Sequence, residues 1–582
     1  MIDYLINLNL EGGQIMENAG QFFKKFSVLM AVLIVTTALV IGCGDGGDPD
    51  ASDDLDPDRK VPEVRFVSST ADDNQIRNEA VQLVADWWEE IGLEVDIQTR
   101  EFNSLVNRVL AAPEDKDFEA YILGWSGRVS RSDPDMFLYS LYHSNQAVDG
   151  GNNSSVFKNE KYDELVSKQR AEMDLEKRQE LVFEAQEVLA EEVPDITLYY
   201  RDEIQGYNNE RWEDLPSMAG EGIFNEQFPY EATPKTDDAE FVIANSANLD
   251  TFNPFAAETV YEWKFLRLVY DKLVRLDENF EPQPWAAEEI NVVEGEDGEV
   301  IDVTLRDDLQ FHDGEPLGPE DVVFTFDYMF EEGIPYFQAF LDPIETVDLM
   351  DDDETIRFTL EEAYAPFITN TLGQIPILPE HIWADVMEEE NLDHPSQFDN
   401  AEAIGSGPFK FDNWERGEYI RIVKNDDYFK ADDIDVEAIR YDKYSHSEGV
   451  FGALENQQAD VNENTFDPEY VQQAEDLDHL TVVREPDIGF DFIGLNNYKE
   501  PFNDKAVRQA AAHAIDLDEL VDVLLYGYGD PAGAGQTIST GNEMWKNDDV
   551  KEYPFDIDKA REILKDAGYE WDSDGRLYFP EE

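Results

Sequence analysis

Residues 63–97 read EVRFVSSTADDNQIRNEAVQLVADWWEEIGLEVDI. Polar and apolar side chains alternate over residues 63–67 and again over residues 93–97, which predicts two β-strands. Between these strands, apolar residues recur at helical spacing over residues 76–91, and Gly92 is a typical helix stop. Strand, helix and strand in succession form the repeating unit of a parallel sheet, so the sequence predicts an α/β fold.

Strands and helices continue to alternate along the chain. A further strand is predicted at residues 117–125, a long helix at 175–192 and a new strand at 241–244. Residues 221–238 carry Pro, Gly and several acidic residues, which is typical of a linker. A mixture of strands and helices is predicted from there to the C-terminus.

The composition combines a strong acidic excess with enough apolar residues to fold. Of the 582 residues, 132 are Asp or Glu and 43 are Lys or Arg, which gives a formal net charge of −89. Hydrophobic residues make up 42% of the chain and aromatic residues 12%, too many for a disordered acidic tail. Nucleic acids are bound by clustered Lys and Arg, and no such cluster is present, so the charge argues strongly against a nucleic-acid partner.

The acidic residues are spread over all predicted elements, so the whole surface is expected to be acidic. Their mutual repulsion strains a compact state at physiological salt, but in molar salt the screening length falls to roughly 3 Å and the repulsion nearly vanishes. The pattern therefore favours adaptation to concentrated brine. Calcium loading is the alternative, and residues 570–581 come closest to a calcium-binding loop, with Glu570 in place of its first Asp.

The N-terminal residues have the pattern of a secretory signal. Two lysines precede an apolar run at residues 26–42, and Cys43, the only cysteine of the chain, follows a small residue. This pattern predicts a lipoprotein signal at residues 1–43 with a lipid on Cys43, and an acidic tether at residues 44–59. The protein is then expected outside the cytoplasm, anchored to a membrane of the cell envelope. A cytosolic chain or a plain N-terminal membrane helix is the alternative. One cysteine also excludes disulfides within the chain.

Four ordered blocks of sequence carry a family resemblance. They are LDTFNP at 249–254, FHDGEP at 311–316, GSGPF at 405–409, and residues 492–516. Together they resemble the family 5 extracellular solute-binding proteins, the peptide- and nickel-type receptors of ABC importers. The resemblance implies an α/β fold of two lobes joined by a hinge, the periplasmic-binding-protein-like type II (cluster C) fold, with an extra subdomain in lobe one.

The order of the family's segments is inverted in this chain. Residues 60–230 resemble the last third of the family, with LGW at 123–125, yet they precede the rest. The chain therefore resembles a circularly permuted member, whose C-terminal strand at 577–579 would continue into the first strand at 64–66. A broken tandem gene pair would give the same order. The implied parts are lobe two at 60–198 plus 491–582, lobe one at 199–276 plus 386–490, and the extra subdomain at 277–385.

The resemblance also implies a ligand cleft between the lobes, with aromatic walls and a few placed charges. The candidate ligand-binding residues are Trp125, Arg128, Arg131, Phe252, Asn253, Tyr261, Trp263, Phe490 and Asp491. For each aromatic residue, an ordinary place in the core is the alternative. Peptide-binding members carry an acid for the peptide α-amine near the proline that matches Pro134, whereas this chain has Ser130 there.

Two arginines flank Ser130 in a chain with few basic residues. If Arg128 and Arg131 face the cleft, they favour a carboxylate or another anion, because a guanidinium donates two parallel hydrogen bonds. The alternative is that both pair with acidic residues at the surface. Asp133 is expected to brace its own loop rather than to contact the ligand.

The resemblance implies a non-catalytic, lipid-anchored receptor of a peptide-type ABC importer. Such a monomer captures a peptide or another small solute by closing its lobes and delivers it to an ABC permease, without a cofactor or a metal. No G-x-S-x-G, H-E-x-x-H or Walker phosphate loop occurs in the chain. The alternatives are a surface lipoprotein that senses or retains ligand without transport and a gene-fusion fragment that no longer binds, and a hydrolase ranks third.

Overall fold

The computed structural model describes residues 55–257, 259–294, 299–333 and 337–581. The expected signal peptide, Cys43 and most of the expected tether lie outside the described residues. Within these ranges, no helix combines the length and the apolar character that a bilayer crossing requires.

The strand–helix–strand unit predicted from residues 63–97 is confirmed. It consists of β1 (Val64–Ser69), α2 (Gln75–Glu90) and β2 (Val95–Arg100), and the two strands pair in parallel. The Asn74 side chain caps α2 by accepting a hydrogen bond from the Arg77 N–H (2.9 Å). Gly92 has a φ of +95°, in the left-handed region that favours glycine, so the chain can reverse after the helix.

This unit belongs to a 12-stranded mixed sheet. Its main path runs β14-β15-β16-β7-β17-β4-β19-β3-β1-β2, and β18 and β20 also pair with β4. The other strands are Ala120–Trp125 (β3), Asp195–Asn208 (β4), Glu240–Asn245 (β7), Phe409–Glu415 (β14), Tyr419–Lys424 (β15), Ala438–Lys443 (β16), Val461–Asn462 (β17), Leu480–Pro486 (β18), Phe490–Leu495 (β19) and Gly529–Pro531 (β20).

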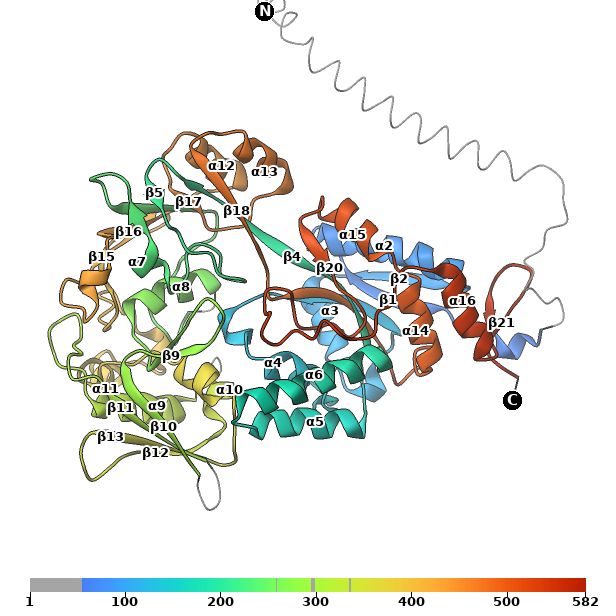
Figure 1. Ribbon diagram of the computed structural model, residues 1–582, viewed down its shortest axis with the longest axis horizontal. Helices are drawn as coiled ribbons and strands as arrows, with labels where there is room; N and C mark the ends of the chain where they lie inside the picture. The colour runs from blue at the N-terminus through green and yellow to red at the C-terminus, as the bar shows by residue number, and fades with distance from the viewer. Residues whose placement is uncertain (1–54, 258, 295–298, 334–336, 582) are drawn as a thin grey trace, which may run out of the picture.

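The long strand β4 belongs to two halves of this sheet. Its first residues pair with β19 and β20, and its last residues pair with β17 and β18. We call the side with β1, β2, β3, β19 and β20 the terminal half, because both ends of the described chain lie in it. The side with β7 and β14 to β18 is the central half. Figure 1 shows β4 passing between the two halves.

The terminal half is a sheet covered by helices on both faces. One face packs against α2, α14 (Lys505–His513), α15 (Leu517–Leu524) and α16 (Ile557–Asp566). The other face packs against α3 (Phe102–Val109), α4 (Asp135–Tyr142), α5 (Glu160–Ala171) and α6 (Leu175–Glu192). Neighbouring residues of β3 enter opposite cores, Ile122 the first and Tyr121 the second, as the alternation of side chains along a strand requires.

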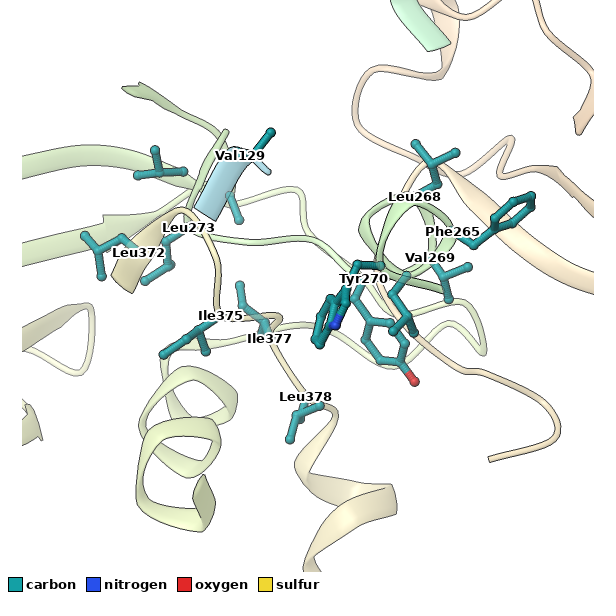
Figure 2. Packing of buried hydrophobic residues seen from close by; sticks show 14 of the residues in the cluster. Val129, Phe265, Leu268, Val269, Tyr270, Leu273, Leu372, Ile375, Ile377 and Leu378 are labelled. Carbon is teal, nitrogen blue, oxygen red and sulfur yellow. The ribbon is translucent and has the colours of Figure 1, made fainter. Parts of the chain in front are cut away.

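The central half carries α8 (Val260–Val269), α12 (Ser447–Glu455) and α13 (Pro468–Glu475), together with a second sheet in the order β10-β11-β13-β12. The remaining bounds are Trp212–Glu213 (β5), Val274–Leu276 (β8), Pro282–Pro284 (β9), Ala287–Glu294 (β10), Glu299–Leu305 (β11), Ile344–Leu349 (β12), Thr355–Leu360 (β13), Pro319–Glu332 (α9), Gln338–Leu341 (α10) and Glu380–Glu389 (α11). The C-terminal hairpin consists of Glu570–Trp571 (β21) and Leu577–Tyr578 (β22). One core joins α8, this second sheet and Val129, which comes from the loop after β3 (Figure 2).

The prediction of a linker at residues 221–238 is wrong. The segment contains the short helix α7 (Phe228–Glu231) and the strand β6 (Thr233–Pro234). Its buried apolar residues include Ile223, Phe224 and Phe228. The acidic residues misled because Glu226 is itself buried, where it pairs with Lys272 (2.5 Å). A buried, paired acid therefore looked in the sequence like a solvated one.

The two ends of the described chain meet in the terminal half. Tyr578 forms an antiparallel bridge with Lys60, and the Val61 N–H donates to the Leu577 carbonyl (3.0 Å). Trp571 is 1% exposed, and its Nε1 donates to the carbonyl of Ile91 at the end of α2 (2.9 Å). Figure 1 shows β21 beside the segment with which the described chain begins. The strand expected to continue the C-terminal one, β1, pairs instead with β2 and β3, and β22 contacts the residues that lead into it.

Candidate functional site

A cavity of about 450 Å³ lies where β4 passes between the two halves. Both halves contribute to its wall: the loop after β3 from the terminal half, and the start of α8 from the central half. The lining residues are Ser126, Gly127, Arg128, Arg201, Asp202, Glu203, Gly220, Glu221, Val260, Tyr261, Lys264, Glu463, Asn464, Thr465 and Asp487. A site built from both halves is sensitive to their relative position.

Most charges in this wall are neutralised by the protein itself. The ion pairs are Lys264 with Glu463 (2.5 Å), Arg201 with Asp491 (2.7 Å), Glu221 with Arg267 (3.1 Å) and Asp202 with Arg484 (2.8 Å). Buried ion pairs of this kind satisfy one another and leave little charge for a ligand. The charged groups without such a partner are therefore the informative ones.

Arg128 is a cation without a partner among the residues that the structure describes. Its side chain is half-buried, its Nε is buried without a hydrogen bond, and the described part of the chain gives it no ion pair. The loop that presents it is held in place, because the Val129 N–H donates to Glu221 Oε1 (3.3 Å) and Val129 packs in the core of the central half. In a chain of net charge −89, an unpaired guanidinium in a cavity favours an anionic group of a ligand.

Glu203 is an unpaired acid in the same cavity. Among the described residues, its carboxylate takes part in no hydrogen bond or ion pair. Burial raises the pKa of Glu203 to about 8, although the positive charge of Lys264 opposes this rise. A ligand cation or N–H donor would relieve the cost of this burial. The cavity thus offers an unpaired guanidinium and an acid without a hydrogen bond, while Asp487, which also lacks an ion pair among the described residues, accepts a hydrogen bond from the Gly489 N–H (3.0 Å).

The raised pKa predicts how stability depends on pH at this residue. The folded protein holds the Glu203 proton more tightly than the unfolded chain does, whose glutamate pKa is near 4.5. The stability that comes from this proton is full below the unfolded value and is lost as the pH rises through about 8. We expect Glu203→Gln to raise the melting temperature relative to the unmodified protein at about pH 8.5 but not at about pH 4.5.

Thermal unfolding in molar salt at both pH values measures this difference. Glu89→Gln, on the exposed face of α2, is the control, and it should shift the melting temperature little and equally at the two pH values. An equal shift at both pH values for Glu203→Gln would contradict the prediction.

A second cavity, of about 240 Å³, lies behind Trp125 in the terminal half. It is enclosed by β3, α3 and α4, and its apolar wall consists of Phe102, Val106, Leu110, Leu123, Trp125, Leu141 and Phe492. The Arg131 guanidinium lies 5.1 Å from the Trp125 ring and donates to the Ser126 carbonyl (2.6 Å), which braces the tryptophan. Since Trp125 lines this cavity and the next three residues line the larger one, the two cavities adjoin at the end of β3.

The structure brings three of the predicted site residues to these cavities. Arg128 and Tyr261 line the larger cavity, and Trp125 lines the smaller. Arg131 braces Trp125 and lines neither of them. The resemblance to the family and the aromatic side chains were the signals that found these residues.

The other predicted site residues lie in the protein interior and line neither cavity. Phe252, Trp263 and Phe490 belong to hydrophobic cores. The Asn253 side chain donates to two backbone carbonyls, those of Pro395 and Phe398 (2.8 Å each).

Two buried acids near the cavities are engaged by arginines. Asp491 is ion-paired with Arg77 and Arg201. Asp133 accepts a hydrogen bond from the Asp135 N–H of its own loop (2.9 Å), as expected, and forms a double hydrogen bond with Arg178 of α6 (2.7 and 2.8 Å). Sequence reasoning missed Glu203 and Lys264, since no local signal separates Glu203 from the other 131 acidic residues of the chain.

Comparison with known proteins decides the family. The family model described as bacterial extracellular solute-binding proteins, family 5 Middle, matches residues 46–149 and 281–581, together more than half of the chain. The chain belongs to this family. The family 5 resemblance of the four sequence blocks and the α/β fold are therefore confirmed.

Two curated family 5 proteins illustrate the similarity. The oligopeptide-binding protein AppA of Bacillus subtilis (strain 168) is 29% identical over 364 residues, which cover 61% of this chain and 64% of AppA. The dipeptide-binding protein of Escherichia coli (strain K12) is 25% identical over 350 residues, which cover 56% of this chain and 63% of that protein. This family 5 chain thus spans a little under two thirds of the length of these two relatives.

A solved family 5 structure is also similar. It is that of AppA from Bacillus subtilis in complex with a nonapeptide, with 25% sequence identity and a TM-score of 0.43. The match covers 57% of this chain and 64% of that one.

Proposed function

We propose that this protein is the extracytoplasmic receptor of a peptide-type ABC importer and captures a small zwitterionic solute. The observation that carries the proposal is a pair of side chains in one cavity, Arg128 and Glu203, that have no ion pair with any described residue. Arg128 suits the carboxylate of a ligand, and Glu203 suits its amine. A peptide with free termini carries both groups, and curated relatives are named for binding oligopeptides and dipeptides.

Closure of the two halves around the ligand is the proposed mechanism of capture. A ligand shifts such an equilibrium only by binding the closed form more tightly than the open one. Arg128 comes from the terminal half and Tyr261 from the central half, so a ligand that contacts both holds the halves together. The permease then receives the closed form, and the receptor makes or breaks no covalent bond. The two halves are proposed to be the lobes expected from the family, with lobe two at 60–198 plus 491–582 and lobe one at 199–276 plus 386–490.

The smaller cavity is proposed to hold an apolar side chain of the same ligand. Its wall is mostly aliphatic and aromatic, and it adjoins the charged cavity at Trp125. An apolar pocket beside a few placed charges is the usual composition of a small-molecule site. The charges then orient the peptide backbone, and the pocket adds binding energy from burial.

A thermal-shift panel in molar salt tests the proposed function. Each short peptide is measured with free termini and as its N-acetylated, C-amidated form. We expect some free peptides to stabilise the fold by about 2.7 kcal/mol at a concentration of 100 times Kd, and so to raise the melting temperature. The blocked forms should raise the melting temperature far less. The absence of a shift with every free peptide, or equal shifts with blocked forms, would contradict the proposal.

Circular permutation of a complete receptor is proposed as the origin of the inverted order. The bridge between Lys60 and Tyr578 and the burial of Trp571 against α2 support it, because the segments at both ends build one hydrophobic core. We expect a permuted receptor to be a monomer, because both ends of one chain complete the same core. Two halves of a broken tandem pair would instead find their partners in a second copy, so a dimer in light scattering would contradict the permutation.

A lipid on Cys43 and adaptation to brine complete the proposal. The cysteine follows an apolar run and two lysines, and the net charge is −89. Cys43→Ala should release the protein from the membrane fraction, and retention there would contradict lipid anchoring.

Lowering the salt from molar to about 0.1 M should lower the melting temperature, and an unchanged melting temperature would contradict adaptation to brine.

A further inference from the structure

A buried acid lines the largely apolar cavity behind Trp125. Asp195 is the first residue of β4, is 1% exposed and lines this cavity. Its Oδ2 accepts a hydrogen bond from the Tyr142 hydroxyl. Its Oδ1 is buried and makes no hydrogen bond of normal geometry within the described residues, and the backbone N–H of Gly535 is the second donor that acts on this carboxyl. One carboxyl oxygen is therefore incompletely satisfied.

Two neighbouring hydroxyl groups of the wall do not complete its hydrogen bonding. The hydroxyls of Tyr121 and Ser154 are hydrogen-bonded to each other (2.5 Å). Burial raises the pKa of Asp195 to about 7, while the hydrogen bonds from the Tyr142 hydroxyl and the Gly535 backbone N–H oppose this rise. A buried polar group without a partner is costly, so it is usually satisfied by water or by a ligand.

We propose that Asp195 makes this cavity select a ligand side chain that is apolar along its length and ends in a hydrogen-bond donor. The inference rests on the proposed function, because it concerns a side chain of the captured peptide. A phenol matches this description: its ring suits the apolar wall, and its O–H can donate to Oδ1. A purely aliphatic or unsubstituted aromatic side chain would fill the same space and leave Oδ1 unpaired.

The test compares tyrosine with phenylalanine in otherwise identical peptides. The probes are Ala-X-Ala tripeptides with X as Phe or Tyr, and their permutations that place X first or last, titrated calorimetrically in molar salt. In the unmodified protein we expect the Tyr peptide to bind about tenfold or more tightly than the Phe peptide at one of the three positions. Asp195→Val should reduce this ratio to about one, and Asp195→Asn, which keeps an acceptor, should retain part of it.

Thr197→Val is the matched control. Thr197 lies two residues along β4, is equally buried and also carries a polar atom without a partner, but it lines neither cavity. This variant should keep the full preference for Tyr. Melting curves of all variants show whether they are folded. If Asp195→Val is not folded, Asp195→Asn gives the answer.

Three results would overturn the inference. The first is equal binding of Tyr and Phe peptides at every position by the unmodified protein, which would mean that water or nothing satisfies Oδ1. The second is a Tyr preference that survives both substitutions of Asp195. The third is the absence of heat with every peptide, which would overturn the proposed function and this inference with it; the first two leave peptide binding intact.

Discussion

Trp571→Ala should lower the free energy of unfolding by about 3–5 kcal/mol, as expected for the loss of a large aromatic side chain from a core. The indole is 1% exposed, donates to the Ile91 carbonyl (2.9 Å) and fills the space above Gly92, where a Cβ would lie 2.7 Å from Nε1. These contacts join the C-terminal hairpin to the helix that follows the first strand. Denaturant unfolding in molar salt measures the effect.

Phe555→Ala is the matched control for this substitution. Phe555 precedes α16 and is 44% exposed, so its loss should change the free energy of unfolding by about 0.5 kcal/mol or less. Hydrogen exchange adds a local readout: Trp571→Ala should reduce the protection of α2 as well as that of the hairpin. Unchanged protection of α2, with a stability loss no larger than that of Phe555→Ala, would show that the chain ends do not share a core.

Arg128→Ala should weaken the binding of a peptide with a free C-terminal carboxylate about tenfold to a hundredfold. The estimate corresponds to the roughly 1.5–3 kcal/mol of a hydrogen bond to a charged group. The guanidinium has no partner among the described residues, so its removal leaves no protein charge uncompensated. The C-amide of the same peptide should bind the variant and the unmodified protein alike. Calorimetric titration of both peptide forms measures the two ratios.

Arg131→Ala separates this effect from a general disturbance of the loop. Arg131 braces Trp125 and lines neither cavity, so its loss should weaken the free and amidated peptides by the same factor. If Arg128→Ala also weakens both forms equally, Arg128 positions the loop and does not bind the carboxylate.

The local architecture could be predicted from the sequence where a periodic pattern and a stop signal agree. The helix predicted at residues 175–192 has those bounds in the structure, and the unit at residues 63–97 is a parallel strand–helix–strand unit. The prediction of a linker at residues 221–238 failed, because acidic composition does not reveal whether an acid is solvated or buried with a lysine. That difference depends on a partner far away in the sequence.

The site could be predicted less well for the same reason. Residue type and family resemblance pointed to Trp125, Arg128 and Tyr261, but they gave equal weight to Phe252 and Trp263, which are core residues. The sequence does not show whether an aromatic side chain lines a cavity or packs in a hydrophobic core. What distinguishes Arg128 and Glu203 is that neither has an ion pair in the described part of the chain, and only the folded arrangement of the other charges reveals this.

A crystal structure with the peptide that gives the largest thermal shift tests the central claim most directly. We predict that the peptide lies in the cavity where β4 crosses between the halves, with its carboxylate within about 3 Å of the Arg128 guanidinium and its amine facing Glu203. A peptide bound elsewhere, or one bound there with Arg128 still unpaired, would contradict the account.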